Sequence, residues 1–528
     1  MSTTQTASRQ APQQPGTDVE VAVLGCGFAG LAMAVELRRR GIDDFVVLER
    51  GDEVGGTWRD NTYPGAACDV PSHLYSFSFA PNPDWSRSFS RQPEIQDYLR
   101  SVADTTGVAP HLRLGHTVAS ATWDEPTERW TVETDHGTFR ARIVVSAVGA
   151  LSEPKDPDIP GLDTFAGTVF HSARWRHDHE LTGERVAVVG TGASAIQLVP
   201  QIQPEVDRLV LFQRTAPWII PRRDRAISER EKRVFRRAPA VQKAVRSAIY
   251  WGRESYAYAF TRDTRLLRVP QSLALWHLRR QVKDPVLREK LTPTYTIGCK
   301  RILISNDYYP ALTQPNVTVE TGGIAEVREH SIVTKDGTEH PVDTIIFGTG
   351  FQVTDMPIAH VLRGRDGRLL ADEWAAGGMR AHRGSTVPGF PNFFLLVGPN
   401  TGLGHTSQVF MIEQQVGFVA EALDLLRTSG ARTVEVRPEA VDVDDAEIQA
   451  RMARSVWTTG GCASWYLDSA GRNTTLWPDF TFRFASRLRT VDPADYVLDG
   501  TAAPPPAPPH ATEEPADGTS PAPSMVPA

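Results

Sequence analysis

The sequence predicts an α/β fold in which two domains of the same strand–turn–helix design share one chain, the second inserted in the first and elaborated by helices. Two glycine-rich turns carry this prediction. One follows a short β-branched run near the N-terminus, and the other follows a similar run 165 residues later. A third observation is the apolar run 344–347, which lies near the start of the expected return to the first domain.

Changes in composition set the expected boundaries of these units. Ser, Thr, Gln and Pro at one end and Pro and Ala at the other cannot build a core, so we expect two disordered tails. Arg and Lys among apolar residues, with few Gly or Pro, predict a helical insertion in the second domain. The expected units are a tail over 1–17, the first domain over 18–150, the second domain over 165–340 with its insertion over 224–291, the return of the first domain over 341–498, and a tail over 499–528.

The bulk composition is that of a soluble enzyme. Hydrophobic residues make up 41% of the chain and charged residues 23%, and the formal charge of −7 argues against nucleic acid as a partner. The N-terminus has neither a signal peptide nor a transmembrane segment, so we expect a cytoplasmic protein. The cysteines lie far apart without C-x-x-C spacing, so we expect reduced thiols and no metal site. They are Cys26, Cys68, Cys299 and Cys462.

The first glycine turn predicts a Rossmann-like domain. Buried-strand residues 19–24 lead into G-x-G-x-x-G and then a helix from Leu31 to Arg40. Such glycines allow a tight turn and close approach to a pyrophosphate, and the helix N-terminus offers unpaired N–H groups to the anion. Glu49 ends the next strand, 45–48, where a carboxylate accepts hydrogen bonds from a ribose and repels a 2′-phosphate. The turn therefore suits the ADP half of FAD, with expected contacts from Gly25, Gly27, Phe28, Ala29 and Gly30.

The second glycine turn repeats this design with a different charge. It follows strand 185–189, and alanine stands in the third glycine position, which the pattern tolerates. The next strand, 209–212, ends in Gln213 and Arg214, whose guanidinium suits a 2′-phosphate. We therefore expect NADPH here, held by Gly190, Gly192, Ala193, Ser194, Ala195, Gln197, Arg214 and Thr215.

Two dinucleotides imply hydride transfer from nicotinamide to flavin, which leaves the final electron acceptor to be identified. A disulfide reductase would need a redox cysteine pair, and no two cysteines stand at short spacing. Oxygen is then the leading acceptor. An NADPH:FAD reductase that passes electrons to a protein carrier stays open as an alternative.

Two motifs resemble those of the type I Baeyer-Villiger monooxygenases, NADPH- and FAD-dependent enzymes that insert oxygen beside a ketone. The first is Phe165-x-Gly167-x-x-x-His171-x-x-x-Trp175, the family fingerprint. The second runs from Gly55-Gly56-Thr57-Trp58 through Tyr63-Pro64-Gly65 to Asp69. The resemblance continues through 298–301, 348–351 and 398–400 and covers about residues 18 to 490.

The resemblance implies a reaction and a set of site residues. One atom of O2 would enter next to a ketone carbonyl through a C4a-peroxyflavin, giving an ester or lactone. Arg301 matches the active-site arginine and Asp69 the carboxylate that positions it. A permanent cation there can stabilise the peroxide anion and the developing oxyanion. Thr57, Trp58, Tyr63 and Asp69 would contact FAD; oxygenation of a sulfide or amine by the protonated peroxide stays an alternative.

The remaining motifs have less specific roles. Phe165, Gly167, His171 and Trp175 lie just ahead of the second glycine turn, so we expect His171 to act in linking or gating the domains rather than as a base. Trp465 lies in 462–473, which resembles a mobile loop over NADP; it would contact the nucleotide or substrate, or else anchor that loop. The basic insertion is read as a solvated helical face, with contact to an anionic membrane as the alternative. The ketone and the oligomeric state are left open.

Overall fold

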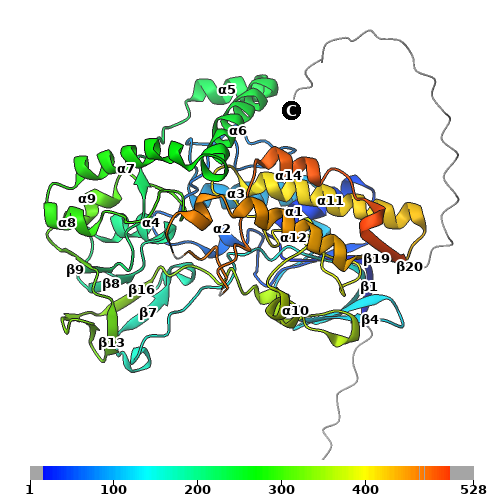
Figure 1. Ribbon diagram of the computed structural model, residues 1–528, viewed down its shortest axis with the longest axis horizontal. Coiled ribbons are helices and arrows are strands. Elements are labelled where there is room, and N and C mark those ends of the chain that lie inside the picture. The colour runs from blue at the N-terminus through cyan, green and yellow to red at the C-terminus, as the bar shows by residue number, and fades with distance from the viewer. Residues whose placement is uncertain (1–15, 463, 469, 500–528) are drawn as a thin grey trace, which may run out of the picture.

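This computed structural model describes residues 16–462, 464–468 and 470–499, so the expected terminal tails lie almost entirely outside the described residues. Two sheets occupy two lobes, with the second sheet at the left of Figure 1 and the first at the right. Helices α5 and α6 lie above both lobes in the same view. This arrangement confirms the expected α/β fold with two Rossmann-like units.

The first sheet takes strands from both ends of the chain. Its order is β17-β4-β5-β6-β1-β2-β3, with β18 pairing β6 in parallel. The chain therefore leaves this sheet after β6 and returns to it with β17 and β18, which confirms the insertion. The strands are β1 (Thr17–Leu24), β2 (Phe45–Leu48), β3 (Leu112–Arg113), β4 (Val118–Asp124), β5 (Arg129–Thr134), β6 (Gly137–Ser146), β17 (Leu362–Arg363) and β18 (Phe393–Leu395).

The second sheet has five parallel strands in the order β12-β9-β8-β16-β7. Strand β16 lies between β8 and β7, so this sheet extends past residue 340, where we placed the end of the second domain. That boundary is corrected because pairing with two neighbours, rather than a change in composition, assigns β16 to the sheet. The strands are β7 (Thr168–His171), β8 (Arg185–Val189), β9 (Arg208–Phe212), β12 (Val317–Glu320) and β16 (Thr344–Phe347).

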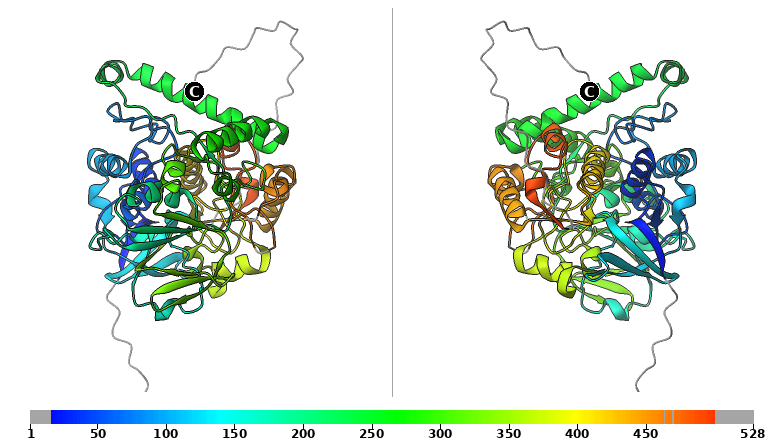
Figure 2. Two further views of the ribbon diagram at one scale, coloured as in Figure 1. Left: turned by 90° about the vertical axis from the view of Figure 1, so that its left-hand side faces the viewer. Right: turned by 90° about the vertical axis from the view of Figure 1, so that its right-hand side faces the viewer.

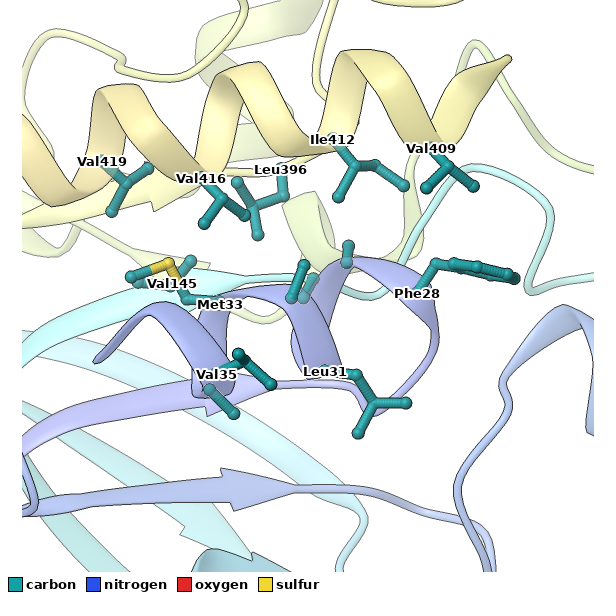
Figure 3. Close-up of a cluster of buried hydrophobic side chains, with 14 of the residues drawn as sticks. Phe28, Leu31, Met33, Val35, Val145, Leu396, Val409, Ile412, Val416 and Val419 are labelled. Carbon is teal, nitrogen blue, oxygen red and sulfur yellow. The ribbon is translucent and has the colours of Figure 1, made fainter. Parts of the chain in front are cut away.

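Helix α1 (Phe28–Arg39) is held between the first sheet and helix α11 (Gln408–Ser429). Figure 3 shows Phe28 and Met33 of α1 facing Val409, Ile412 and Val416 of α11, all of them in one cluster of buried apolar side chains. Each such buried aliphatic or aromatic side chain contributes about 1.5–3 kcal/mol. The start of α1, and with it the first glycine turn, is thereby fixed against both parts of the first domain.

The helical insertion consists of α5 (Glu229–Arg237), α6 (Pro239–Thr261), α7 (Arg268–Gln281) and α8 (Pro285–Lys290). Ser228 and Glu231 form a capping box that starts α5. The long helix α6 crosses the upper side of the molecule in both views of Figure 2. None of the described helices is both long enough and apolar enough to span a membrane.

The other elements complete the two lobes. They are α2 (Thr57–Asp60), α3 (Gln92–Thr105), α4 (Ala193–Ile202), α9 (Tyr308–Leu312), α10 (Leu370–Gly377), α12 (Pro438–Met452), α13 (Val456–Thr459), α14 (Thr481–Arg487), β10 (Ile219–Ile220), β11 (Leu303–Ile304), β13 (Ile324–Arg328), β14 (Ser331–Thr334), β15 (Glu339–Pro341), β19 (Thr433–Val436) and β20 (Tyr496–Asp499).

Candidate functional site

In the first glycine turn the backbone leaves no room for a side chain at Gly25 or at Gly30. Gly25 has φ +99°, and a Cβ on Gly30 would lie 1.9 Å from the carbonyl oxygen of Gly25. A second pair of glycines, Gly55 and Gly56, contacts this turn: the amide of Gly55 donates to the carbonyl of Cys26 at 2.9 Å. The first turn of α1 carries no acidic residue, so its N-terminal dipole is open to an anion.

The carboxylate of Glu49 accepts hydrogen bonds from other residues of the protein. It is buried, and its Oε2 accepts from the amide of Cys26 at 2.8 Å while its Oε1 accepts from Gly51 at 2.8 Å and from Arg59 at 2.6 Å. The carboxylate is thus fixed directly beside the glycine turn, and Arg59 offsets its charge. Sequence analysis did not single out Arg59; the contact with ribose stays a prediction.

The second glycine turn packs against the loop that follows β16. Gly190 has φ +115°, and a Cβ there would lie 2.4 Å from the carbonyl oxygen of Gly348. Gly192 and Ala193 are exposed at the start of α4, whose first turn also lacks acidic residues. This helix N-terminus is therefore accessible to a diphosphate.

Two cations lie near this turn. Arg214 is exposed, and burial together with the positive charge of Arg214 lowers the pKa of Lys300. Arg214 and Lys300 therefore lie close enough for their like charges to repel. Such a pair of cations suits a doubly charged anion such as a 2′-phosphate. Lys300 was missed by sequence reasoning, although it directly precedes Arg301 in the motif 298–301.

The segment expected to hold FAD contacts α4 directly. The hydroxyl of Tyr63 donates to Gln197 Oε1 at 2.9 Å, and Gln197 Nε2 donates to the carbonyl of Ala67 at 2.9 Å. Burial raises the pKa of Tyr63 to about 12, so it remains a donor at neutral pH. The structure thus brings Tyr63 and Gln197, predicted for different nucleotides, into contact with each other.

Arg301 and Asp69, 232 residues apart, form a bidentate ion pair. Nε of Arg301 donates to Oδ2 of Asp69 at 2.7 Å, and Nη2 donates to Oδ1 at 2.6 Å. Burial opposes ionisation of Asp69, but the charges of Arg301 and then Arg253 hold its pKa below the ordinary value. Asp69 raises the pKa of Arg301 in turn, so both groups are charged near neutral pH.

The ion pair is partly accessible. Of the Arg301 side chain 37% is exposed, and of the Asp69 side chain 21%. Thr57 is also exposed, whereas Trp58 is buried and donates Nε1–H to the hydroxyl of Tyr75 at 3.0 Å. Thr57 is therefore available to a ligand, while Trp58 supports the fold of this segment.

A disulfide corrects the expectation of four reduced thiols. Cys299 and Cys462 are bonded, and the buried Cys26 and Cys68 are free. The partners are 163 residues apart, so no spacing rule could pair them. The bond ties the segment of Arg301 to the loop predicted to cover NADP.

Tyr466, rather than Trp465, reaches Arg301 from that loop. Tyr466 is buried, hydrogen-bonded to the backbone of Arg301, and its pKa is raised by burial to about 12. Trp465 is 46% exposed, and its ring centroid lies 4.3 Å from that of Tyr466 in a tilted arrangement. A nucleotide or substrate contact by Trp465 stays a prediction; Tyr466 was not predicted.

The fingerprint residues lie at the second sheet. A Cβ on Gly167 would lie 2.1 Å from the carbonyl oxygen of Asp343, so the motif requires glycine there. His171 ends β7; its Nδ1 accepts from the amide of Ala173 at 3.1 Å, and burial lowers its pKa. Its contacts are structural, including the ring of Phe351. Phe165 packs in the core of this sheet, and Trp175 packs edge-on against Phe170.

This chain resembles known proteins in both sequence and structure. A family described as pyridine nucleotide-disulphide oxidoreductase matches residues 22–228. A Baeyer-Villiger monooxygenase of Streptomyces coelicolor is 57% identical over 92% of this chain and 94% of its own length. The closed crystal structure of cyclohexanone monooxygenase has a TM-score of 0.81 and 28% identity, over 92% of this chain and 100% of that one. A structure of OTEMO in complex with FAD and NADP has a TM-score of 0.80 and 27% identity, over 89% and 97% of the two chains.

Proposed function

The chain belongs to the Baeyer-Villiger monooxygenases, and from this membership we propose that it inserts one oxygen atom of O2 next to the carbonyl of a ketone, using FAD and NADPH. The product is an ester or a lactone. The observation that carries the proposal is the bidentate pair of Arg301 and Asp69, in which the guanidinium stays partly accessible.

The pair suits this reaction because it keeps a cation fixed where negative charge develops. Asp69 occupies Nε and Nη2 of Arg301 and so fixes the plane of the guanidinium. The remaining N–H groups can donate to the carbonyl oxygen of the ketone as it becomes negative. A Lys in place of Arg301 would present a single flexible ammonium and lose this geometry.

The two glycine turns fit the two cofactors. The crowded first turn with Glu49 suits the ADP part of FAD, and the open N-terminus of α4 with Arg214 and Lys300 suits NADPH. Bound FAD, once reduced by NADPH, supplies the electrons that activate O2. We assign His171 to linking the domains, because its contacts are with its own strand end and the loop after β16.

Family membership, rather than cysteine spacing, now supports O2 as the acceptor. The absence of a closely spaced cysteine pair argued against a dithiol acceptor, but the Cys299–Cys462 bond shows that distant cysteines do pair here. The relatives are monooxygenases, and the bond joins two loops beside Arg301.

The test is product analysis with labelled oxygen. FAD-loaded protein is given NADPH, ¹⁸O2 and cyclic, linear and aryl ketones, and products are identified by mass spectrometry. We expect an ester or lactone with one labelled atom. Oxygenation of sulfides or amines alone, or transfer of electrons to a carrier without O2, would replace the proposal.

A further inference from the structure

Arg253 is a cation of the inserted helix α6 that reaches the reaction site without a carboxylate partner of its own. Its Nη2 donates to the backbone carbonyl of Asp69 at 3.3 Å, and its Nη1 donates to the backbone carbonyl of His405 at 3.2 Å. Within the described residues no Asp or Glu forms an ion pair with it, and burial lowers its pKa. A half-buried guanidinium that donates to backbone carbonyls and, within the described residues, to no carboxylate has a desolvation cost that calls for a reason beyond packing.

The two carbonyls belong to segments that are far apart in the sequence. Asp69 lies in the irregular stretch after α2, and His405 lies in the loop that leads into α11. The planar guanidinium can donate to both at once, which a lysine ammonium on its flexible stem cannot reproduce. Arg253 therefore bridges the backbone of the two parts of the first domain from a helix of the inserted one.

The next residue on α6 strengthens this bridge. Glu254 is buried, accepts from the hydroxyl of Thr481 at 2.8 Å and lies 3.3 Å from Nε2 of His405. His405 therefore contacts α6 twice. Its carbonyl accepts from Arg253, and its ring lies next to the carboxylate of Glu254. A movement of this turn of α6 would displace the His405 loop and Asp69 together.

We infer that Arg253 is a positioning residue of the reaction site, which holds the backbone of Asp69 and thereby the orientation of Arg301. The inference rests on the proposed function. On this inference, helix α6 connects the inserted domain to the ion pair of Arg301 and Asp69 and controls the geometry of that pair.

Charge supports the same role. Arg253 is the second cation, after Arg301, that holds the pKa of Asp69 below its ordinary value against burial. The other groups facing Asp69 are the cation Arg222 and four groups whose pKa burial raises to about 12 or higher. Those four are Tyr63, Cys68, Tyr75 and Tyr466. Of the groups named, Asp69 is the one that titrates in acid, so removing Arg253 shifts the acidic limb of ester formation upward.

Helix α6 offers a matched control two turns away. Arg246 Nη1 donates to the carbonyls of His73 and Ser76, both at 2.8 Å, and burial lowers its pKa as well. It therefore also donates to backbone carbonyls of a neighbouring stretch, away from Asp69, although it has an ion-pair partner in Glu413 at 3.7 Å. A general loss of stability should appear in Arg246→Gln and Arg253→Gln alike, whereas an effect on the ion pair should appear only in the second.

The experiment compares Arg253→Gln, Arg253→Lys and Arg246→Gln in the FAD-loaded protein. For Arg253→Gln we expect ester formed per NADPH to fall on the order of tenfold, because misplaced reacting groups lose rate steeply. The missing oxygen should appear as H2O2, and the KM for NADPH should stay within about twofold. Arg253→Lys should keep the pH profile and lose part of the ester yield. If Arg253→Gln does not fold, the Arg253→Lys variant is used for the test instead. Wild-type yield and pH profile in either Arg253 variant, even with a lower Tm, would overturn the inference.

Hydrogen–deuterium exchange separates this inference from the proposed function. Exchange over residues 66–72 should rise in Arg253→Gln and stay at the wild-type level in Arg246→Gln, whatever the substrate is. Unchanged exchange there in Arg253→Gln contradicts the link. Failure of wild-type protein to form any ester contradicts the proposed function and leaves the exchange result to decide on Arg253.

Discussion

The hydroxyl of Tyr63 lies 2.9 Å from Oε1 of Gln197, and this hydrogen bond joins the two nucleotide-binding units. Gln197 belongs to α4, which begins at the second glycine turn, while Tyr63 lies six residues before Asp69. The same Gln197 side chain also bonds both backbone groups of Ala67. A shift of α4 is therefore transmitted directly to the segment that carries Asp69.

Tyr63→Phe should weaken this connection. The variant leaves a buried amide oxygen with one partner fewer, so we expect the free energy of unfolding to fall by about 1 kcal/mol. We also expect more H2O2 per NADPH consumed, because the two units are less firmly joined. Thermal denaturation and peroxide assays measure the two effects. Tyr258→Phe, at an exposed position on α6, is the control and should change neither.

Arg301→Lys should separate reduction from oxygenation. The ammonium cannot hold both oxygens of Asp69, so we expect ester formation to fall by about 100-fold or more. Anaerobic reduction of the flavin by NADPH should continue, as followed by its absorbance. Arg328→Lys, which alters an exposed ion pair on β13, should leave both steps unchanged. Equal losses in reduction and oxygenation would assign Arg301 to NADPH binding instead.

Arg214→Ala and Lys300→Met should raise the KM for NADPH. Loss of one charge-assisted contact to a phosphate costs about 1.5–3 kcal/mol, which corresponds to about a 10- to 100-fold weaker affinity. NADH, which lacks the 2′-phosphate, serves as the internal control, and its KM should hardly change. Steady-state kinetics with both nucleotides measure this. An equal rise in the KM for NADH would mean that Arg214 and Lys300 contact a part of the nucleotide other than the 2′-phosphate.

Reduction of the Cys299–Cys462 bond should destabilise the protein and loosen the Tyr466 loop. Such bonds typically contribute about 2–4 kcal/mol. We expect the Tm of the wild type to fall in a thiol reductant and that of Cys299→Ser to be lower already and insensitive to it. Under denaturing, non-reducing conditions, thiol labelling should modify Cys26 and Cys68 only. Labelling of all four cysteines would contradict the bond.

The ion pair predicts a stability that depends on pH. Arg301 and Arg253 hold the pKa of Asp69 below its ordinary value of about 3.9, despite burial, so ionised Asp69 stabilises the fold above about pH 4. This stabilisation is lost as the pH falls through the lower value of the folded state. Wild type should therefore exceed Asp69→Asn in Tm at pH 7, and the difference should narrow below about pH 4. Asp97→Asn, at an exposed site, should show no such change.

The local elements were predictable because each depends on neighbouring residues. Strands 45–48, 185–189 and 344–347 lie where their apolar runs predict them. Both glycine turns have the close backbone contacts that their spacing implies. The end of the second domain was misplaced because the pairing of β16 depends on strands far away in the chain.

The two glycine turns, the α/β class and the insertion could be predicted from residue patterns alone, and motif resemblance pointed to Arg301 and Asp69. These features depend on short stretches of sequence. The contacts between distant groups at the site became visible only in the folded chain: the Cys299–Cys462 bond, Tyr466 on the backbone of Arg301, and Arg253 on the carbonyl of Asp69. These contacts join segments more than 150 residues apart, and no local pattern specifies which of many buried side chains will end beside a given carbonyl.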